Sequence, residues 1–259
     1  MRRVMAAIMR HSASDWTAVV SPLSSWQGQA LIVGGGGIGR ALRAELARRA
    51  PGLQVHLATR QPQASDQWHL DLCDDQSLQR LREHALAAWA PLRLVINTAG
   101  VLHSPLLQPE KRLSAICRAQ LEHSFAVNAF GPILLAQALG DALERSQPSH
   151  WASLSARVGS IGDNQLGGWY SYRAAKAAQN QLLRTLALEW RRRLPNCCVS
   201  LLHPGTTATD LSAPFRGAVD PERLFTPDQS AGYLLDVLEG LSAADSGGFW
   251  AWDGKAIPW

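Results

Sequence analysis

The chain has 259 residues, of which 46% are hydrophobic and 18% are charged. This is enough apolar material for one sizeable core but short for two independent domains, so we expect a single domain. The formal net charge of +4 excludes the strong charge imbalance of a disordered chain. The densest basic run, Arg191 to Arg193, ends a predicted helix, where cations complement the helix dipole. We therefore expect no nucleic-acid binding.

The N-terminal region and the cysteines bear on the cellular compartment. Residues 1–28 are expected to form a poorly ordered extension, because Arg10, His11 and Asp15 interrupt the apolar stretch that a secretory signal needs. No apolar run approaches the roughly 20 residues of a membrane span, so we expect no membrane association. The four cysteines show neither a Cys-x-x-Cys pair nor a disulfide-framework spacing, which favours a reducing, cytoplasmic location.

From Ala30 onward, short apolar runs alternate with longer segments of helical period. The predicted strands are Ala30–Val33, Gln54–Ala58, Leu92–Asn97, Trp151–Ser155, Cys198–Leu202 and Phe249–Trp252. The predicted helices are Ile38–Arg49, Asp75–Trp89, Ala115–Glu144, Tyr170–Leu194 and Pro227–Leu241. This alternation predicts an α/β fold, a single-domain doubly wound Rossmann fold over residues 29–259, with a mostly parallel central sheet and helices on both faces.

A capping box begins the last of these helices: Thr226 is the expected cap, Pro227 occupies the first helical position, and Gln229 lies three residues after the cap.

A glycine-rich turn follows the first predicted strand directly and opens the first helix. Gly34, Gly36 and Gly39 satisfy the G-x-G-x-x-G pattern in its required strand-to-helix setting. Glycines allow the backbone to approach a pyrophosphate, whose charge the free N–H groups of a helix N-terminus attract. The sequence therefore predicts a dinucleotide site at Gly34, Gly36, Gly37, Ile38 and Gly39.

The end of the second strand bears on which dinucleotide binds. NAD-binding versions of this fold carry an acidic residue here, whereas this strand ends in Ala58-Thr59-Arg60. Arg60 can bind a 2′-phosphate in a bidentate manner, and no carboxylate repels it. We therefore expect NADP(H) to be preferred, with NAD(H) possible; a solvated loop arginine is the other reading of Arg60.

Tyr172 and Lys176 lie at i and i+4 on one face of a predicted helix. A free tyrosine titrates near pH 10, and a nearby ammonium favours the phenolate and lowers the pKa. The pair is thus suited to proton transfer, although taken alone this spacing is usually an ordinary helix surface.

Further motifs occur in one fixed order around this pair: the glycine loop, Asn97-Thr98-Ala99-Gly100, Asn128, the serine-containing strand end, and Pro204-Gly205. Together they resemble the short-chain dehydrogenase/reductase family over residues 30–259. The segments Arg157-Val158-Gly159-Ser160-Ile161 and Gly167-Gly168-Trp169-Tyr170, and the ending from Ser246 to Trp259, are similar to the C-factor and sniffer-type carbonyl reductase branch.

The resemblance implies hydride transfer between a nicotinamide and a carbonyl or alcohol carbon. It implies that Tyr172 donates the proton, that Lys176 lowers the tyrosine pKa and binds the nicotinamide ribose, and that Asn128 holds a proton-relaying water. The further cofactor positions that it implies are Asp71, Leu72, Asn97, Ala99, Gly100, Pro204, Gly205 and Thr209. From the residues alone, Asp71 could equally be a turn residue, Asn97 a fastener of neighbouring strands, and Asn128 a helix-surface amide.

Two positions depart from the family pattern. The glycine loop is one residue shorter than usual, with Gly34 nearest the role of the first glycine. The position of the carbonyl-polarising serine, three residues before Gly159, holds Ala156. Ser155 is adjacent and is our candidate for that role, provided that the strand bends or bulges there; Ser160 is a second candidate.

We therefore expect an NAD(P)-dependent oxidoreductase that acts on a small-molecule carbonyl or alcohol, with a substrate lid at 206–226 and no metal. The resemblance implies a homodimer or homotetramer. A dinucleotide-binding regulatory or signalling protein with weak or vestigial activity is the alternative, because Ala156 replaces the serine.

Overall fold

A computed structural model of the protein describes residues 22–104, 108–218 and 220–259. Seven strands form one sheet in the order β3-β2-β1-β4-β5-β6-β9, and each neighbouring pair is parallel. The strands are β1 (Gly28–Val33), β2 (Leu53–Thr59), β3 (Gln67–His69), β4 (Leu92–Asn97), β5 (Ser149–Leu154), β6 (Cys197–His203) and β9 (Gly248–Ala251). The expected doubly wound fold is confirmed.

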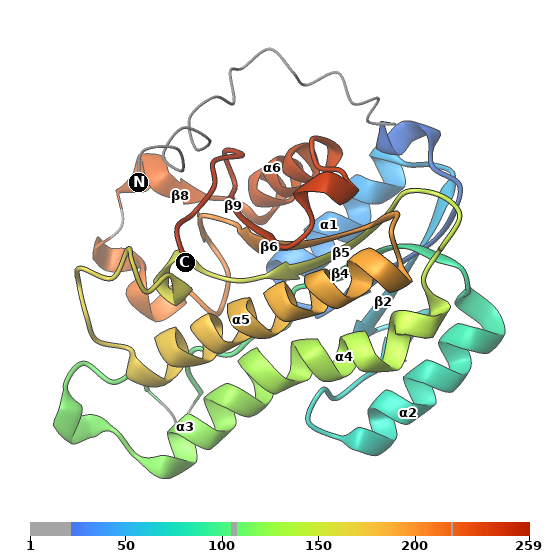
Figure 1. Ribbon diagram of the computed structural model, residues 1–259. Helices are drawn as coiled ribbons and strands as arrows, with labels where there is room; N and C mark the ends of the chain where they lie inside the picture. The colour runs from blue at the N-terminus through green and yellow to red at the C-terminus, as the bar shows by residue number, and fades with distance from the viewer. Residues whose placement is uncertain (1–21, 105–107, 219) are drawn as a thin grey trace, which may run out of the picture.

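Helices cover both faces of the sheet, with α4 and α5 side by side on one face and α1 and α6 on the other (Figure 1). The helices are α1 (Gly37–Arg49), α2 (Asp75–His84), α3 (Arg118–Phe125), α4 (Gly131–Leu139), α5 (Tyr170–Arg193) and α6 (Pro227–Glu239). Turns of π-helix at Ala85–Trp89 and Ala126–Phe130 extend α2 and join α3 to α4. The expected capping box of α6 is present, with Gln229 N donating to Thr226 Oγ1 over 3.2 Å and Thr226 N to Gln229 Oε1 over 2.8 Å.

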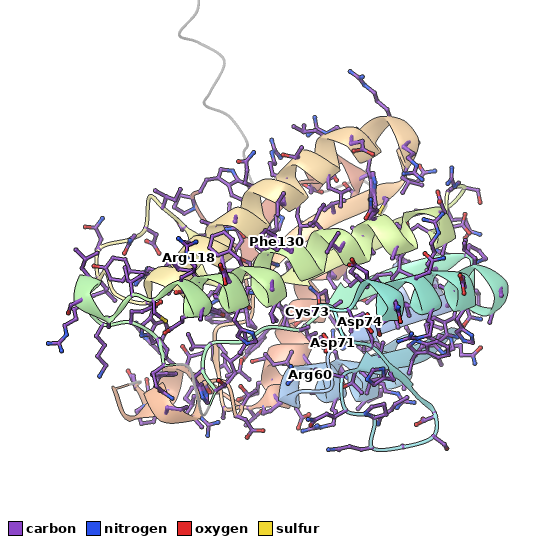
Figure 2. All side chains as sticks on the ribbon, turned by 90° about the horizontal axis from the view of Figure 1, so that it is seen from below. Arg60, Asp71, Cys73, Asp74, Arg118 and Phe130 are labelled. Atoms are coloured by element: carbon purple, nitrogen blue, oxygen red, sulfur yellow. The ribbon has the colours of Figure 1, made fainter. Side chains whose placement is uncertain are left out.

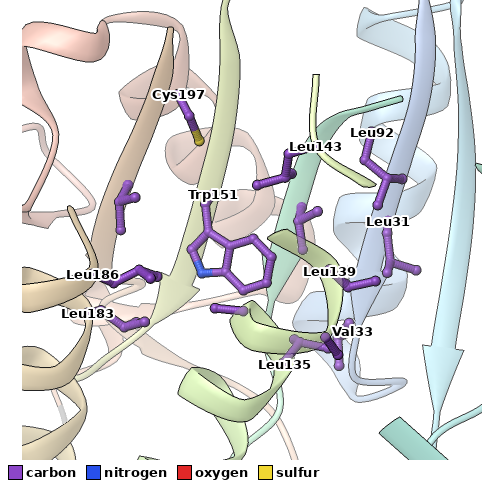
Figure 3. Packing of buried hydrophobic residues seen from close by; sticks show 14 of the residues in the cluster. Leu31, Val33, Leu92, Leu135, Leu139, Leu143, Trp151, Leu183, Leu186 and Cys197 are labelled. Atoms are coloured by element: carbon purple, nitrogen blue, oxygen red, sulfur yellow. The ribbon is translucent and has the colours of Figure 1, made fainter. Parts of the chain in front are cut away.

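Two apolar cores result from the alternation of side chains along the strands. Leu31 and Val33 belong to the core that α2, α4 and α5 cover, whereas Ala30 and Ile32 belong to the core under α1 and α6. Figure 3 shows Trp151 of β5 at the centre of the first core. Around it lie Leu183 and Leu186 of α5 and Leu135 and Leu139 of α4. Strands buried on both faces explain why their sequences are almost continuously apolar.

Part of the expected N-terminal extension belongs to the folded domain. Leu23 and Trp26 are buried, Trp26 stacks on His150 at 5.3 Å between ring centroids, and the Arg93 guanidinium lies 4.4 Å from the Trp26 ring centroid. The remainder, residues 1–21, lies outside the described residues. A local sequence pattern did not reveal this packing because the partners are distant in the chain.

The continuous helix over Arg118–Ala142 is, within the described part of the chain, long and apolar enough to span a membrane. The sequence showed no uninterrupted apolar run, since Glu122 and Asn128 lie within this segment. Of its most apolar window, 56% is buried inside the protein, and Leu135 and Leu139 lie in the core. These features are those of a core helix.

A second, two-stranded sheet closes the base of the segment 206–226. In it β7 (Thr206–Thr207) pairs with β8 (Leu224–Phe225) in parallel. Neither these strands nor β3 was among the predicted strands, because two or three residues are too few to show a period.

Candidate active site

The glycine loop is tightly packed on its inner side and open on its outer side. Gly34 has a φ of +108°, and a Cβ there would lie 2.5 Å from Thr98 Oγ1; at Gly39 it would lie 1.9 Å from Gly34 O. At Gly36, by contrast, no heavy atom of the described residues lies within 4 Å of such a Cβ. Two of these glycines therefore allow close packing of the backbone, and the third leaves room for a group outside the loop.

This open side has the properties that a pyrophosphate needs. Helix α1 begins at Gly37, and within the described chain no side chain caps it, so its first N–H groups face outward with the positive end of the helix dipole. A Cβ at Gly37 would lie 3.0 Å from Thr209 Cγ2. The fold thus brings Thr209, which is distant in sequence, to the expected cofactor site. The shortened loop fits a dinucleotide.

Arg60, Asp71 and Cys73 lie together beyond the end of β2 (Figure 2). Burial raises the pKa of the Cys73 thiol, the charge of Asp71 raises it further, and the charge of Arg60 opposes both. Arg60 itself is exposed, whereas the Asp71 carboxylate accepts a hydrogen bond of 2.9 Å from Cys73 N. The Asp71 side chain thus takes part in a turn, and Arg60 remains accessible to an anion. Leu72, between Asp71 and Cys73, is buried.

Asn97 fastens two strands at the carboxyl edge of the sheet. Its Nδ2 donates to Ser153 Oγ of β5 over 3.0 Å, and its Oδ1 accepts from Ala99 N over 3.1 Å. Gly100 follows at an exposed position, where a Cβ would lie 3.2 Å from Asn128 Oδ1 and 3.8 Å from Lys176 Nζ. Asn128 and Lys176 thus approach Gly100 together.

Asn128 lies in the π-helical turn between α3 and α4 and is fully buried. Its Oδ1 accepts from Val101 N over 3.0 Å, and its Nδ2 donates to Val101 O over 2.8 Å. These bonds exclude the helix-surface interpretation. Turns of π-helix frequently occur at functional sites.

Tyr172 and Lys176 are both buried on the same face of α5, and Lys176 Nζ lies 5.9 Å from the Tyr172 ring centroid. The ammonium donates to Leu154 O and to Gln179 Oε1, each over 2.8 Å. Burial raises the pKa of Tyr172 and lowers the pKa of Lys176 to about 7. The sequence suggested that the ammonium would lower the tyrosine pKa; in the folded chain, loss of solvent acts in the opposite direction.

The Ser155 hydroxyl, our candidate for polarising the carbonyl group, is engaged within the protein. Strand β5 ends at Leu154 with a regular register to β6, and Ser155 is the first residue after the strand. The Ser155 hydroxyl is buried and donates to Asn180 Oδ1 over 2.6 Å. The Ser160 hydroxyl is also buried and accepts from Asp163 N over 3.1 Å. Ala156, half-buried, occupies the strand end between them.

Several site residues were not anticipated from the sequence. Gln179 donates to Ser153 Oγ over 2.8 Å while accepting from Lys176, and so it links the lysine to β5. Its i+3 spacing from Lys176 was a usable signal. Glu110, buried beside α5, accepts a 3.2 Å hydrogen bond from Ser171 N, and no local pattern identifies it.

The turn Pro204-Gly205 packs against aromatic side chains. Gly205 has a φ of +75°, and a Cβ there would lie 2.5 Å from Phe225 Cε2 and 3.0 Å from Trp252 Cδ1. The turn thus joins the end of β6 to the base of the segment 206–226.

Among the residues that the structure describes, no group of three or more His, Cys, Asp or Glu side chains could hold a metal ion. The cysteines Cys197 and Cys198 are buried in the two cores.

The fold and the site define a dinucleotide-binding oxidoreductase of the Rossmann type. The sequence profile of the short chain dehydrogenases matches residues 29–219. The chain belongs to this family and is an NAD(P)-dependent oxidoreductase.

Two relatives illustrate the range of the family. C-signal of Myxococcus xanthus is 34% identical over 170 residues, which cover 65% of this chain and 93% of the relative. A 1-hydroxy-2-glutathionyl-2-methyl-3-butene dehydrogenase of Rhodococcus sp. (strain AD45) is 32% identical over 192 residues, which cover 73% of this chain and 78% of the relative.

Among solved structures, the NADPH-bound carbonyl reductase from chicken fatty liver is similar, with a TM-score of 0.76 and 26% identity. The match covers 90% of this chain and all of that one. Together with C-signal, this similarity supports the carbonyl reductase branch of the family.

Proposed function

We propose that the protein is an NADP(H)-preferring carbonyl reductase or alcohol dehydrogenase. One observation carries the proposal: the buried Asn128 and Lys176 lie together beside Gly100, and the buried Tyr172 lies beside Lys176. The glycine loop, which leaves room for a pyrophosphate, lies at the same edge of the sheet.

The cofactor would be held by residues from the ends of several strands. The glycine loop, Gly34 to Gly39, would receive the pyrophosphate at the N-terminus of α1. Asp71, Leu72, Asn97, Ala99 and Gly100 would border the adenosine, and Pro204, Gly205 and Thr209 the nicotinamide. Bound NADP(H) supplies the hydride.

Tyr172 is the proton donor in reduction and the acceptor in oxidation. Because burial raises its pKa, the phenol stays protonated at neutral pH, which is the form that reduction requires. Lys176 would hydrogen-bond the nicotinamide ribose and would supply positive charge beside the phenol. Asn128, whose side-chain amide is fixed by Val101, would hold a water that relays protons to Lys176.

The polarisation of the carbonyl group falls on Tyr172, because the Ser155 proton is directed to Asn180. The hydrogen bond between Ser155 and Asn180 thereby joins the end of β5 to α5. Ala156 is also the reason for the alternative function, a regulatory protein with weak or vestigial activity. The presence of both Tyr172 and Lys176 favours an active enzyme over that alternative.

The NADP preference rests on the exposed Arg60 and on the lack of a carboxylate at the end of β2. The similarity to an NADPH-bound carbonyl reductase agrees with this choice. NAD(H) would bind more weakly, because its ribose offers Arg60 no phosphate.

A parallel titration with NADPH and NADH, followed by nicotinamide fluorescence at fixed salt, tests the proposal. We expect NADPH to bind more tightly, and Arg60→Ala to weaken NADPH binding about tenfold while leaving NADH binding unchanged. Arg191→Ala, at the far end of α5, is the matched control. Binding of neither dinucleotide would overturn the proposal.

The protein is expected to act in the cytoplasm on a small-molecule substrate as a homodimer or homotetramer. The exposed Phe130 and Leu188 lie on the helices that contain Asn128 and Tyr172, and they offer apolar contacts to a second subunit. Light scattering of the purified protein measures the assembly, and a monomer would refute this part of the proposal.

A further inference from the structure

The three residues before α5 form a left-handed turn. Gly167 and Gly168 have φ values of +64° and +66°, and Trp169 has a φ of +51°. Glycine adopts this conformation readily, whereas an aromatic residue does so only where its surroundings enforce it. The surroundings of Trp169 therefore indicate why this side chain is held here.

Contacts from two directions enforce the turn. Trp169 N donates to Glu110 O over 2.5 Å, and Arg173 Nε donates to Gly168 O over 3.0 Å. The buried Glu110 carboxylate also accepts from Ser171 N over 3.2 Å and from the Ser171 hydroxyl. Glu110 thus fixes the start of α5 on either side of Tyr170, and with it the indole of Trp169.

The indole lies between the tyrosine and the segment 206–226. The Trp169 ring is 6.3 Å from the Tyr172 ring and 5.0 Å from the Phe215 ring, measured between centroids. Phe215 also contacts His103 at 5.8 Å, and His103 Nε2 donates to Asp210 O over 3.1 Å. Trp169, Phe215 and His103 therefore form an aromatic wall beside the phenol.

The position of Phe215 is set by its own segment. The Ser212 hydroxyl lies 2.5 Å from Thr207 O and 3.0 Å from Thr209 O, and Arg216 Nε donates to Ser212 Oγ over 3.1 Å. The pairing of β7 with β8 holds the base of the segment. The aromatic wall is thus built from three separate parts of the chain, each held by its own hydrogen bonds.

We propose that Trp169 and Phe215 determine specificity by selecting a substrate that carries a flat apolar group next to its reacting carbonyl carbon. This inference rests on the proposed function. A carbonyl oxygen that accepts the Tyr172 proton places its nearest substituent against the indole, which is half-buried and only 6.3 Å from the phenol ring. Flat groups stack on or meet the edge of such rings, whereas puckered rings of the same size do so less closely.

The test compares benzaldehyde with cyclohexanecarboxaldehyde, which match in carbon skeleton but differ in flatness. With NADPH, kcat/KM of the unchanged enzyme should favour benzaldehyde at least tenfold. Trp169→Ala and Phe215→Ala should each lower this ratio about tenfold, and Trp169→Phe should retain most of it. Trp259→Ala, which removes a half-exposed indole stacked on Phe249, is the matched control.

Binding measurements distinguish failure of the proposed selectivity from failure of the proposed function. Calorimetry with NADPH present, which cannot oxidise an alcohol, compares benzyl alcohol with cyclohexylmethanol, and we expect the flat alcohol to bind more tightly unless Trp169 is replaced. Equal affinities, equal kcat/KM values, or a preference that survives both alanine variants would overturn this inference and leave the proposed function standing. Failure of NADPH to bind would overturn the proposed function itself.

Discussion

The dinucleotide half and the substrate half of the site are held in different ways. At the ends of β1, β2 and β4, the dinucleotide half depends on backbone: glycines without a Cβ and the N-terminus of α1. At the ends of β5 and β6, the substrate half depends on side chains from distant segments, such as Glu110, Trp169 and Phe215.

This difference teaches where variation is tolerated. A site made of backbone groups keeps its shape when most surrounding side chains change, so it continues to bind the same cofactor. A site made of side chains changes with each substitution, so it sets the substrate. Ala156, at the position where the family resemblance implies a serine, lies in the substrate half.

The largest expected effect comes from the Tyr172 phenol, whose loss should affect the substrate half and not the dinucleotide half. Tyr172→Phe removes the proton donor, and because general acid catalysis contributes about 10² to 10⁴ in rate, we expect a loss of kcat of this order. NADPH affinity should change less than about threefold, because the ring remains. The measurements are steady-state kinetics and a nicotinamide fluorescence titration; full turnover by this variant would refute the role of Tyr172.

The next largest effect is expected when a hydroxyl group is added to the substrate half by Ala156→Ser. Ala156 is half-buried and extended, with φ of −145° and ψ of 148°, so serine fits there without strain. A missing oxyanion donor costs about 100- to 1,000-fold in rate. Ala156→Ser should therefore raise kcat by about 10- to 100-fold at unchanged NADPH affinity.

Ser155→Ala is the matched variant for this test. Its hydroxyl is bonded to Asn180, so its loss should lower stability by about 1 kcal/mol and should affect kcat less than Ala156→Ser does. If kcat falls in Ser155→Ala by a larger factor than it rises in Ala156→Ser, then Ser155 is the residue that polarises the carbonyl group.

The third prediction concerns the dinucleotide half and compares two glycines. Gly36→Ala meets open space, so the protein should remain stable while the new methyl group weakens NADPH binding about tenfold. Gly39→Ala would place a Cβ 1.9 Å from Gly34 O, and overpacking of this kind costs about 1–3 kcal/mol or more. Urea unfolding and NADPH titration of both variants measure the contrast, and equal stability of the two would contradict it.

The smallest effect is a pH dependence of stability that arises from Lys176. Burial lowers its folded-state pKa to about 7, below the roughly 10.4 of an exposed lysine. Between these values the unfolded chain binds the additional proton, so the contribution of Lys176 to the free energy of unfolding rises with pH, by up to about 1.4 kcal/mol per unit.

Urea unfolding at pH 7.0 and pH 8.5 measures this contribution as the difference between the unchanged protein and Lys176→Met. That difference should shift in favour of the unchanged protein as the pH rises. Lys255→Met, at an exposed lysine paired with Asp253, is the control and should show no such trend.

Much of the dinucleotide half could be predicted from the sequence, because its determinants are local. The strand, the glycine loop and the helix are contiguous from Gly28 to Arg49, and the capping box of α6 lies within four residues. Tyr172 and Lys176 are one helical turn apart, so their proximity also follows from spacing.

The sequence by itself determined the alternation of strands and helices, the parallel sheet, the glycine loop and the order of the motifs, because backbone periodicity and residue conformation specify these locally. Only the tertiary structure decided that the Ser155 hydroxyl binds Asn180, that Leu23 and Trp26 join the core, and that Glu110 holds Trp169 beside Phe215. Each of these features joins residues far apart in the chain, and such contacts depend on packing, which local pattern does not encode.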